Sequence, residues 1–252
     1  MDETLLSRIE DAGLNASAPP LQRWLDGWLL RFSPGKAKRA RCINALAVGR
    51  LPQAQRLRLA LDAYAQAGLP ALVRITPFTQ PPGLDDWLAA QGWGALDDTR
   101  VMVNPQLPIA EPPPLPAGTV WQALDAAAYA EAVGALRGSP PGQRRAHAVR
   151  LASSPVAYCG FAIRRDDDGS VLACGQFARE ADIVGLYDVH THPQARGQGL
   201  ASTLCKRLLS LSALEGATLA YLQVEPSNEA ARRIYRRLGF ADAYAYHYRQ
   251  AP

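Results

Sequence analysis

The residues with the clearest chemical potential form a glycine-containing turn at 194–202, which reads Gln-Ala-Arg-Gly-Gln-Gly-Leu-Ala-Ser. Gly197 and Gly199 permit a tight turn and leave nearby backbone amides unshielded by a Cβ. The apolar segment 183–191 predicts a strand before the turn, and the 3.6-residue apolar periodicity of 199–214 predicts a helix after it. Because a helix N-terminus carries unpaired amides and a partial positive charge, the pattern predicts a site for a phosphate group.

Other phosphate-binding and metal-binding patterns fit this region poorly. The turn lacks the third glycine of a dinucleotide-binding fingerprint, and no Gly-Lys-Ser/Thr follows as in a Walker loop. Arg196 instead adds a full positive charge, and Ser202 offers a hydroxyl in the first helical turn. His190 and His192 have the spacing of a metal-ligand pair on a strand, but no third ligand is evident, so we predict no metal.

A second group of residues follows the next predicted strand. Asn228, Ala231 and Tyr235 lie at positions i, i+3 and i+7, so they share one face of a predicted helix that ends at Gly239-Phe240. Each has a structural alternative, because asparagine is a common helix N-cap and a tyrosine on an amphipathic helix is often a core residue. A functional role is favoured because this group follows the glycine turn at a spacing that allows both to belong to one site.

Together the two groups resemble the Gcn5-related N-acetyltransferase (GNAT) family over residues 156–249. The family pattern is Gln/Arg-x-x-Gly-x-Gly/Ala between a strand and a helix, with an Asn…Tyr…Gly-Phe segment after the next strand. The resemblance implies an α/β fold with a mixed sheet, the acyl-CoA N-acyltransferase fold, with acetyl-CoA as co-substrate. It implies cofactor contacts by Val189, His190, Thr191, Gln194, Arg196, Gly197, Gln198, Gly199, Leu200, Ala201, Ser202, Asn228 and Tyr235.

The resemblance also implies roles for these groups. The backbone of 189–191 would pair with the pantetheine arm as an added strand would, and the amides of 196–202 would hold the pyrophosphate. Tyr235 would protonate the departing thiolate, because a phenol with an ordinary pKa of about 10 stays protonated at neutral pH. The implied reaction moves an acetyl group to a primary amine of a small molecule, amino acid or peptide by direct attack in a ternary complex.

The group that accepts the proton from the amine stays open. Asp188 and His190 alternate onto one face of the predicted strand, and Glu225 ends the neighbouring strand, where the two strands should separate. We take Asp188 and Glu225 as candidate bases. The alternatives are a structural hydrogen bond for Asp188 and a packed imidazole for His190. A backbone amide near Thr191 would stabilise the developing oxyanion.

A proline-rich segment divides the chain into two related halves. Residues 104–118 hold six prolines in a stretch without apolar periodicity, which is typical of an extended linker. We expect a complete GNAT domain at 119–252 and a degenerate GNAT-like domain at 1–103. Residues 72–77 resemble 221–226, and each segment continues into a predicted helix that ends in glycine and an aromatic residue. The alternative is that any α/β repeat produces such a match.

The first half lacks the residues of the predicted site. No Gln-x-x-Gly-x-Gly precedes the helix predicted at 52–67, and Leu88 stands where the second half has Tyr235. We therefore expect a non-catalytic half that shapes or covers the acceptor site. The C-terminal strand 240–249, rich in tyrosine, either closes the core or lines the acceptor pocket, and the sequence leaves both open.

Composition excludes several classes of protein. No segment of the 252 residues approaches the ~20 apolar residues of a membrane span, and the acidic N-terminus is unlike a signal peptide. The net charge of +4 is too small to indicate a nucleic-acid partner, and Lys36 to Arg41 is interpreted as a solvated hairpin. Four cysteines without paired spacing indicate a reducing compartment, so we expect a cytoplasmic protein.

Two functions remain at this level. The first is an acetyl-CoA-dependent N-acetyltransferase, as a monomer or homodimer, with an amine acceptor and no metal. The second is a non-catalytic module that senses acyl-CoA. Tyr235 favours the enzyme, because a sensor does not need a proton donor at the thiolate.

Overall fold

One mixed sheet runs through the chain, which the computed structural model describes over residues 1–252. Its 11 strands lie in the order β1-β2-β3-β4-β11-β5-β10-β9-β8-β7-β6. The strands are β1 (Leu21–Leu25), β2 (Trp28–Phe32), β3 (Ile43–Ala45), β4 (Leu72–Ile75), β5 (Gly94–Asn104), β6 (Thr119–Leu124), β7 (Tyr158–Arg165), β8 (Val171–Glu180), β9 (Ile183–Thr191), β10 (Leu219–Val224) and β11 (Ala241–Gln250). The helices are α1 (Glu3–Ala16), α2 (Gln53–Gln66), α3 (Leu84–Ala90), α4 (Ala126–Leu136), α5 (Pro141–Ala152), α6 (Leu200–Leu214) and α7 (Glu229–Arg237). The predicted α/β class with a mixed sheet is confirmed.

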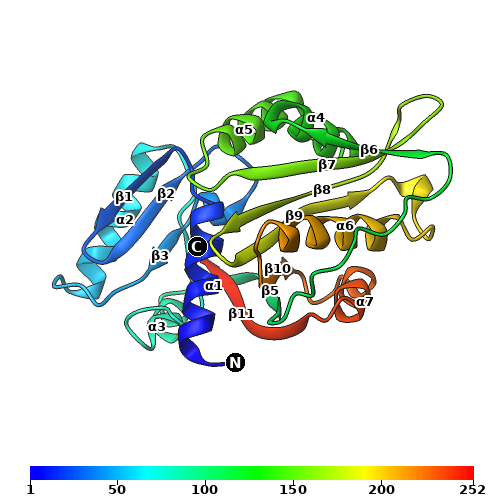
Figure 1. Ribbon diagram of the computed structural model, residues 1–252. Helices are drawn as coiled ribbons and strands as arrows, with labels where there is room; N and C mark the ends of the chain where they lie inside the picture. Colours follow the sequence, from blue (N-terminus) through cyan, green and yellow to red (C-terminus); the bar gives the residue numbers. More distant parts are fainter.

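Helices cover both faces of this sheet (Figure 1). In the C-terminal half, α6 packs on one face of β8 and β9, and α4 and α5 lie on the opposite face. The buried side of α1 packs on the same face as α4, at the junction of the two halves, against tyrosines of β9, β10 and β11. None of the helices has the length and apolar character needed to cross a membrane.

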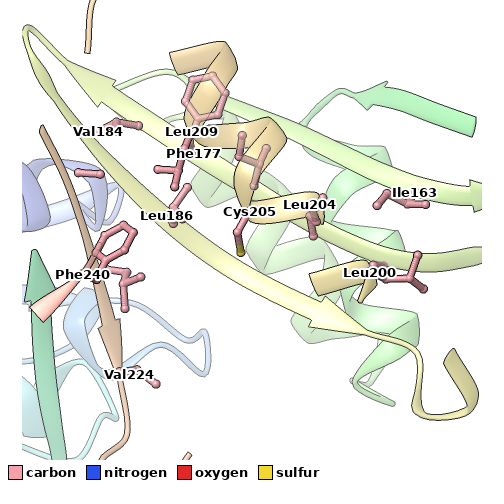
Figure 2. Packing of buried hydrophobic residues seen from close by; sticks show 14 of the residues in the cluster. Ile163, Phe177, Val184, Leu186, Leu200, Leu204, Cys205, Leu209, Val224 and Phe240 are labelled. Carbon is pink, nitrogen blue, oxygen red and sulfur yellow. The ribbon is translucent and has the colours of Figure 1, made fainter. Parts of the chain in front are cut away.

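The core beneath α6 holds the glycine turn in place. Leu200, Leu204 and Leu208 form one stripe of the helix, and each is at most 3% exposed. Figure 2 shows residues of this cluster between the helix and the strands that carry Phe177 and Leu186. Because the first helical residue is already buried, the turn before α6 is anchored at the end of β9.

The last strand of each half is exchanged with the other half. β5 lies between β10 and β11 and pairs antiparallel with both, and β11 lies between β4 and β5. The strand that follows β10 in the chain therefore does not pair with it. The proline-rich segment 104–118 leads from β5, in the middle of the sheet, to the edge strand β6. Neither half completes its part of the sheet without a strand of the other.

The two halves repeat one order of elements. In the first, β1, β2 and β3 pair antiparallel, and β3 continues through α2 to its parallel neighbour β4. In the second, β7, β8 and β9 pair antiparallel, and β9 continues through α6 to its parallel neighbour β10. A helix and an exchanged strand then close each half. The two halves therefore share this order of elements.

The largest differences from the predicted elements fall in the first half. β1 was not predicted, because four of its five residues are exposed and it has no buried face to produce an apolar alternation. β3 is only three residues long, and a 3-10 turn at Lys38–Ala40 precedes it. In the second half, β9 begins and ends at the predicted residues, 183 and 191.

Candidate active site

The site opens where two parallel strands separate. β9 and β10 pair from Ile183 and Leu219 to Leu186 and Leu222, and no pairing continues beyond these residues. A cavity of about 310 Å³ lies in the opening, lined by both strand ends and by Asn228 and Tyr235 of the following segment. The predicted separation of the strands is therefore present.

A larger groove of about 660 Å³ adjoins this opening. It is bounded by the end of β9, the glycine turn with the start of α6, and one face of α7. Of the predicted cofactor contacts, those that line the groove are Val189, His190, Thr191, Arg196, Gly197, Gly199, Leu200, Ala201, Ser202, Asn228 and Tyr235. Gln194 and Gln198 are exposed and do not line it. Val189, Asn228 and Tyr235 also line the opening between the strands, so the two cavities meet there.

The glycine turn presents free amide groups to the groove. Gly197 and Gly199 have φ of +80° and +77°, in the left-handed region that glycine adopts without a Cβ penalty. The backbone amides from Gly197 to Ser202 donate to no backbone or side-chain acceptor, whereas the next amide, of Thr203, donates to Gly199 O. A run of unpaired amides at a helix N-terminus is an anion-binding arrangement.

The corresponding turn of the first half is already filled by a carboxylate. Asp26, in the turn between β1 and β2, accepts hydrogen bonds from the amides of Arg50 (2.9 Å) and Leu51 (2.8 Å), just before α2. Arg56 Nε lies 3.2 Å from the same carboxylate. The amides of Arg50 and Leu51 lower the pKa of Asp26, so the group is ionised at neutral pH. The amides that would receive a phosphate here are therefore satisfied within the chain.

Tyr235 lies at the boundary of the two cavities. Its ring packs edge-on against Phe240, with 6.1 Å between the ring centroids. Burial, with the nearby Cys205 thiol as a smaller cause, raises the pKa of the Tyr235 phenol well above its usual value. The side chain therefore carries its proton throughout the neutral pH range, as a proton donor must.

A β-bulge sets the direction of Asp188. On β8, Cys174 pairs with His190 and Gln176 pairs with Tyr187, so β9 holds one more residue than its partner in this interval. Asp188 itself has φ of +52°. Leu186 packs beneath α6, and strict alternation would point Asp188 the same way. The extra residue reverses this direction, so Asp188 faces α4 and α5.

The Asp188 carboxylate is held by several polar partners. Arg137 Nη2 donates to Oδ1 at 3.0 Å, and Gln176 Nε2 donates to Oδ2 at 3.0 Å. His147 Nε2 lies 3.3 Å from Oδ2. Burial alone would raise the pKa of this carboxyl, but His147 and the charge of Arg137 outweigh it and hold the pKa far below its usual range. The buried Tyr129 hydroxyl donates to the Asp188 carbonyl oxygen at 3.0 Å and fixes the bulge from the backbone side.

The other predicted polar residues have fewer partners. Glu225 is exposed, lines the opening between the strands and forms no salt bridge. Asn228 caps α7, since its Oδ1 accepts from the amide of Ala231 at 3.2 Å. Burial, and then the charges of Arg137 and Arg196, lower the pKa of His190, so its imidazole is neutral at pH 7. No third histidine, cysteine or carboxylate joins His190 and His192 to form a metal-binding group.

The first half also reaches the opening between the strands, through residues that the sequence did not single out. Arg39 lines it, hydrogen-bonds to Gln223 and lies over the Tyr187 ring, 5.9 Å from the centroid. The interpretation of 36–41 as a solvated hairpin was therefore wrong for Arg39, whose partners are more than 140 residues away in the chain. By contrast, Tyr246 and Tyr248 are buried in the core against α1.

A splayed parallel strand pair with a glycine turn and a free helix N-terminus beside it is the architecture of an acetyltransferase. The family model described as the acetyltransferase (GNAT) family matches residues 113–240, and the chain belongs to this family. The match covers the opening, the glycine turn and α7. It ends at Phe240, the residue before β11.

Known proteins resemble the chain over nearly its full length. An uncharacterized N-acetyltransferase, YobR, from Bacillus subtilis (strain 168) is 25% identical over 240 residues, which cover 90% of this chain and 91% of that protein. A GCN5-related N-acetyltransferase from Kribbella flavida has a similar structure, with a TM-score of 0.70, 21% identity, and coverage of 98% and 95%. A tandem GNAT protein from the clavulanic acid biosynthesis pathway also has a TM-score of 0.70, with 16% identity and coverage of 94% and 87%. The two structures share their fold with both halves of this chain.

Proposed function

We propose that the chain transfers an acetyl group from acetyl-CoA to a primary amine by direct attack in a ternary complex. The observation that carries the proposal is the run of free amides from Gly197 to Ser202, at one end of a groove that leads to Tyr235. The amides and Arg196 suit the pyrophosphate, and the unpaired edge of β9 suits an extended amide arm. The positive charge lies where the pyrophosphate would bind, and the groups follow one another along the groove in the same order as the parts of acetyl-CoA that they would bind.

The chain's residues supply proton transfer and charge stabilisation at the opening between the strands. Acetyl-CoA supplies the thioester, whose carbonyl carbon forms the new bond to nitrogen as its bond to sulfur breaks. A backbone amide near the bulge of β9 stabilises the negative charge on the carbonyl oxygen. Tyr235 donates its proton to the departing sulfur, which leaves as the free thiol. The amine nitrogen loses one proton to a base, and the products are an N-acetylated amine and coenzyme A.

We propose Glu225 in preference to Asp188 as that base. Both carboxylates line the opening, but Asp188 is held by Arg137 and Gln176, and its lowered pKa makes it a weak proton acceptor. Glu225 has no cationic partner and is exposed to the cavity. Asp188 would then act as a positioning residue that keeps the bulge in place.

The first half is proposed to be a degenerate GNAT-like domain, at 1–103, joined by the linker 104–118 to the catalytic domain at 119–252. Its order of elements repeats that of the second half, and Asp26 fills the turn that would bind a pyrophosphate. The first half contributes Arg39 to the lining of the opening between β9 and β10, where the acceptor amine is proposed to bind. This arrangement supports a single cofactor site in each chain.

The test is the release of free thiol from acetyl-CoA in the presence of pooled primary amines, with mass analysis of the acetylated product. The proposal predicts thiol release that depends on the amine and a product heavier by one acetyl group. Coenzyme A binding with no amine-dependent release for any acceptor would favour the alternative, a module that senses acyl-CoA.

A further inference from the structure

A third cavity, of about 250 Å³, lies between the two halves, beside the opening between β9 and β10. One wall is the segment 33–37 of the first half, which follows β2. The other wall is the end of α4 and one face of α5, where His147 and Arg150 lie three residues apart. The cavity is polar, since its only apolar lining residues are Ala37 and Ala146.

The charges around this cavity do not balance. Lys36, Arg137 and Arg150 line it, and Asp188 is its only carboxylate. Asp188 already forms its ion pair with Arg137, at 3.0 Å. Lys36 and Arg150 form no salt bridge with any carboxylate of the chain; Arg150 lies over the Tyr158 ring, with 5.9 Å to the centroid. Two cations, one from each half, are therefore left to face the cavity.

The cavity adjoins the opening between β9 and β10. Arg137 and Asp188 line both spaces, so the two cavities meet at this ion pair. A small molecule that spans them would place one end beside Tyr235 and Glu225 and its other end between Lys36 and Arg150. The first end is where an amine must meet the thioester, and the second end is positively charged.

We propose that the acceptor is a small amine that also carries an anionic group, a carboxylate or a phosphate, bound between Lys36 and Arg150. This inference rests on the proposed transferase function and narrows its acceptor. Charge-assisted hydrogen bonds from lysine and arginine are the usual means of binding both anions. The polar lining and the small volume disfavour a long apolar amine. The subsite draws one cation from each half, which gives the first half a role in acceptor specificity.

The experiment compares acceptors in matched pairs, with free thiol release as the readout. β-Alanine and γ-aminobutyrate are each paired with their neutral carboxamides, and O-phosphoethanolamine is paired with ethanolamine. Each pair is assayed with the wild-type chain, Lys36→Gln, Arg150→Gln and the control Arg145→Gln. Arg145 is exposed on the same helix as Arg150 but does not line the cavity, so its variant makes the same change of charge outside the subsite.

The expected result is a kcat/KM at least about tenfold higher for the anionic member of a pair, with the carboxylate and phosphate pairs showing which anion fits. Lys36→Gln and Arg150→Gln should each remove most of this preference, because they lower kcat/KM for the anionic member more than for the neutral member, and Arg145→Gln should retain it. Because Lys36 is exposed, its substitution is not expected to affect folding. Equal use of both members by the wild-type chain would overturn the subsite while leaving the transferase function intact.

A second readout separates the two proposals if no amine is turned over. The binding of γ-aminobutyrate and O-phosphoethanolamine to the complex with coenzyme A is then measured by calorimetry for the wild-type chain and Lys36→Gln. Binding that Lys36→Gln weakens about tenfold or more would support the anion subsite even though the transferase proposal had failed. The anion subsite would be overturned if neither ligand bound, or if the wild-type chain and Lys36→Gln bound the ligands equally.

Discussion

Arg137 Nη2 donates to Asp188 Oδ1 at 3.0 Å, and this ion pair joins the end of α4 to the bulge of β9. The pair lies where the proposed acceptor subsite meets the opening between the strands. The carboxylate is anchored on its other oxygen by Gln176. A carboxylate held in this way is suited to fix the geometry of the strand end.

Asp188→Asn should destabilise the chain at neutral pH by about 1–2 kcal/mol, because Arg137 loses its ionic partner in a half-buried place. The folded-state pKa of Asp188 lies below its unfolded value of about 3.9. The stabilisation is therefore fully present above the unfolded pKa and is lost as the pH falls below it. Denaturant unfolding at pH 7 and pH 3 should show a difference between wild type and variant that shrinks at pH 3. A constant difference would contradict this assignment.

Glu225→Gln should lower kcat/KM at pH 7 by about 100-fold, because the amine loses its proton acceptor. The loss should shrink as the pH rises and more of the amine is already unprotonated. Asp188→Asn should instead lower activity by a factor that varies little with pH, since Asp188 is ionised across this range. Rate profiles from pH 6 to 10 distinguish the two, and an exchange of these behaviours would make Asp188 the base.

Tyr235→Phe should lower kcat by about 100-fold or more and leave the affinity for coenzyme A nearly unchanged, because only the proton donor is removed. Burial raises the pKa of Tyr235, so the phenol keeps its proton at every pH up to about 10. Over this range, deprotonation of Tyr235 should cause no decrease in the wild-type rate. Tyr248→Phe is the matched control, a buried tyrosine of β11 that lines neither cavity. Unchanged turnover by Tyr235→Phe at every pH would refute the role.

Gly197→Glu should raise the dissociation constant of coenzyme A by about 100-fold. The substitution places a carboxylate beside the pyrophosphate and puts a side chain on a residue with φ of +80°. Gly216→Glu is the control, because Gly216 also has a positive φ and open space around its Cβ position but lies after α6, away from the groove. Calorimetric titration should find the control close to wild type, and an equal effect of both variants would indicate general damage.

One coenzyme A should bind per chain. The amides before α2 are occupied by Asp26, and no equivalent of Tyr235 is present in the first half. The titration must use the full chain, because the exchange of β5 and β11 leaves each isolated half without a strand of its sheet. A stoichiometry of two would show that the first half retains a cofactor site.

Much of the cofactor groove could be predicted because its features are local. The periodicity of 199–214 predicts α6, and two glycines separated by one residue predict the turn before it. Asn228 and Tyr235 fall on one face of α7 through helical geometry alone. Gln194 and Gln198 were predicted to contact the cofactor, but they are exposed and do not line the groove. The sequence does not show which residues of a turn point into the groove and which point into solvent.

The acceptor side could not be predicted in the same way. Lys36 and Arg150 carry a polar pattern typical of any solvated face, and only the packing of the first half against α5 brings them to one cavity. Arg39 reaches Gln223 across the sheet, and Asp26 reaches two amides in another loop. No spacing in the sequence marks these contacts.

The sequence by itself determined the family, the α/β class and the position of the glycine turn, because these depend on periodicity and backbone preferences within one or two elements. The tertiary structure alone decided the exchange of β5 and β11, the direction of Asp188 and the cations of the acceptor side. Strand register and the packing of distant segments control these features. One extra residue in β9 is enough to turn a carboxylate from α6 to the opposite face.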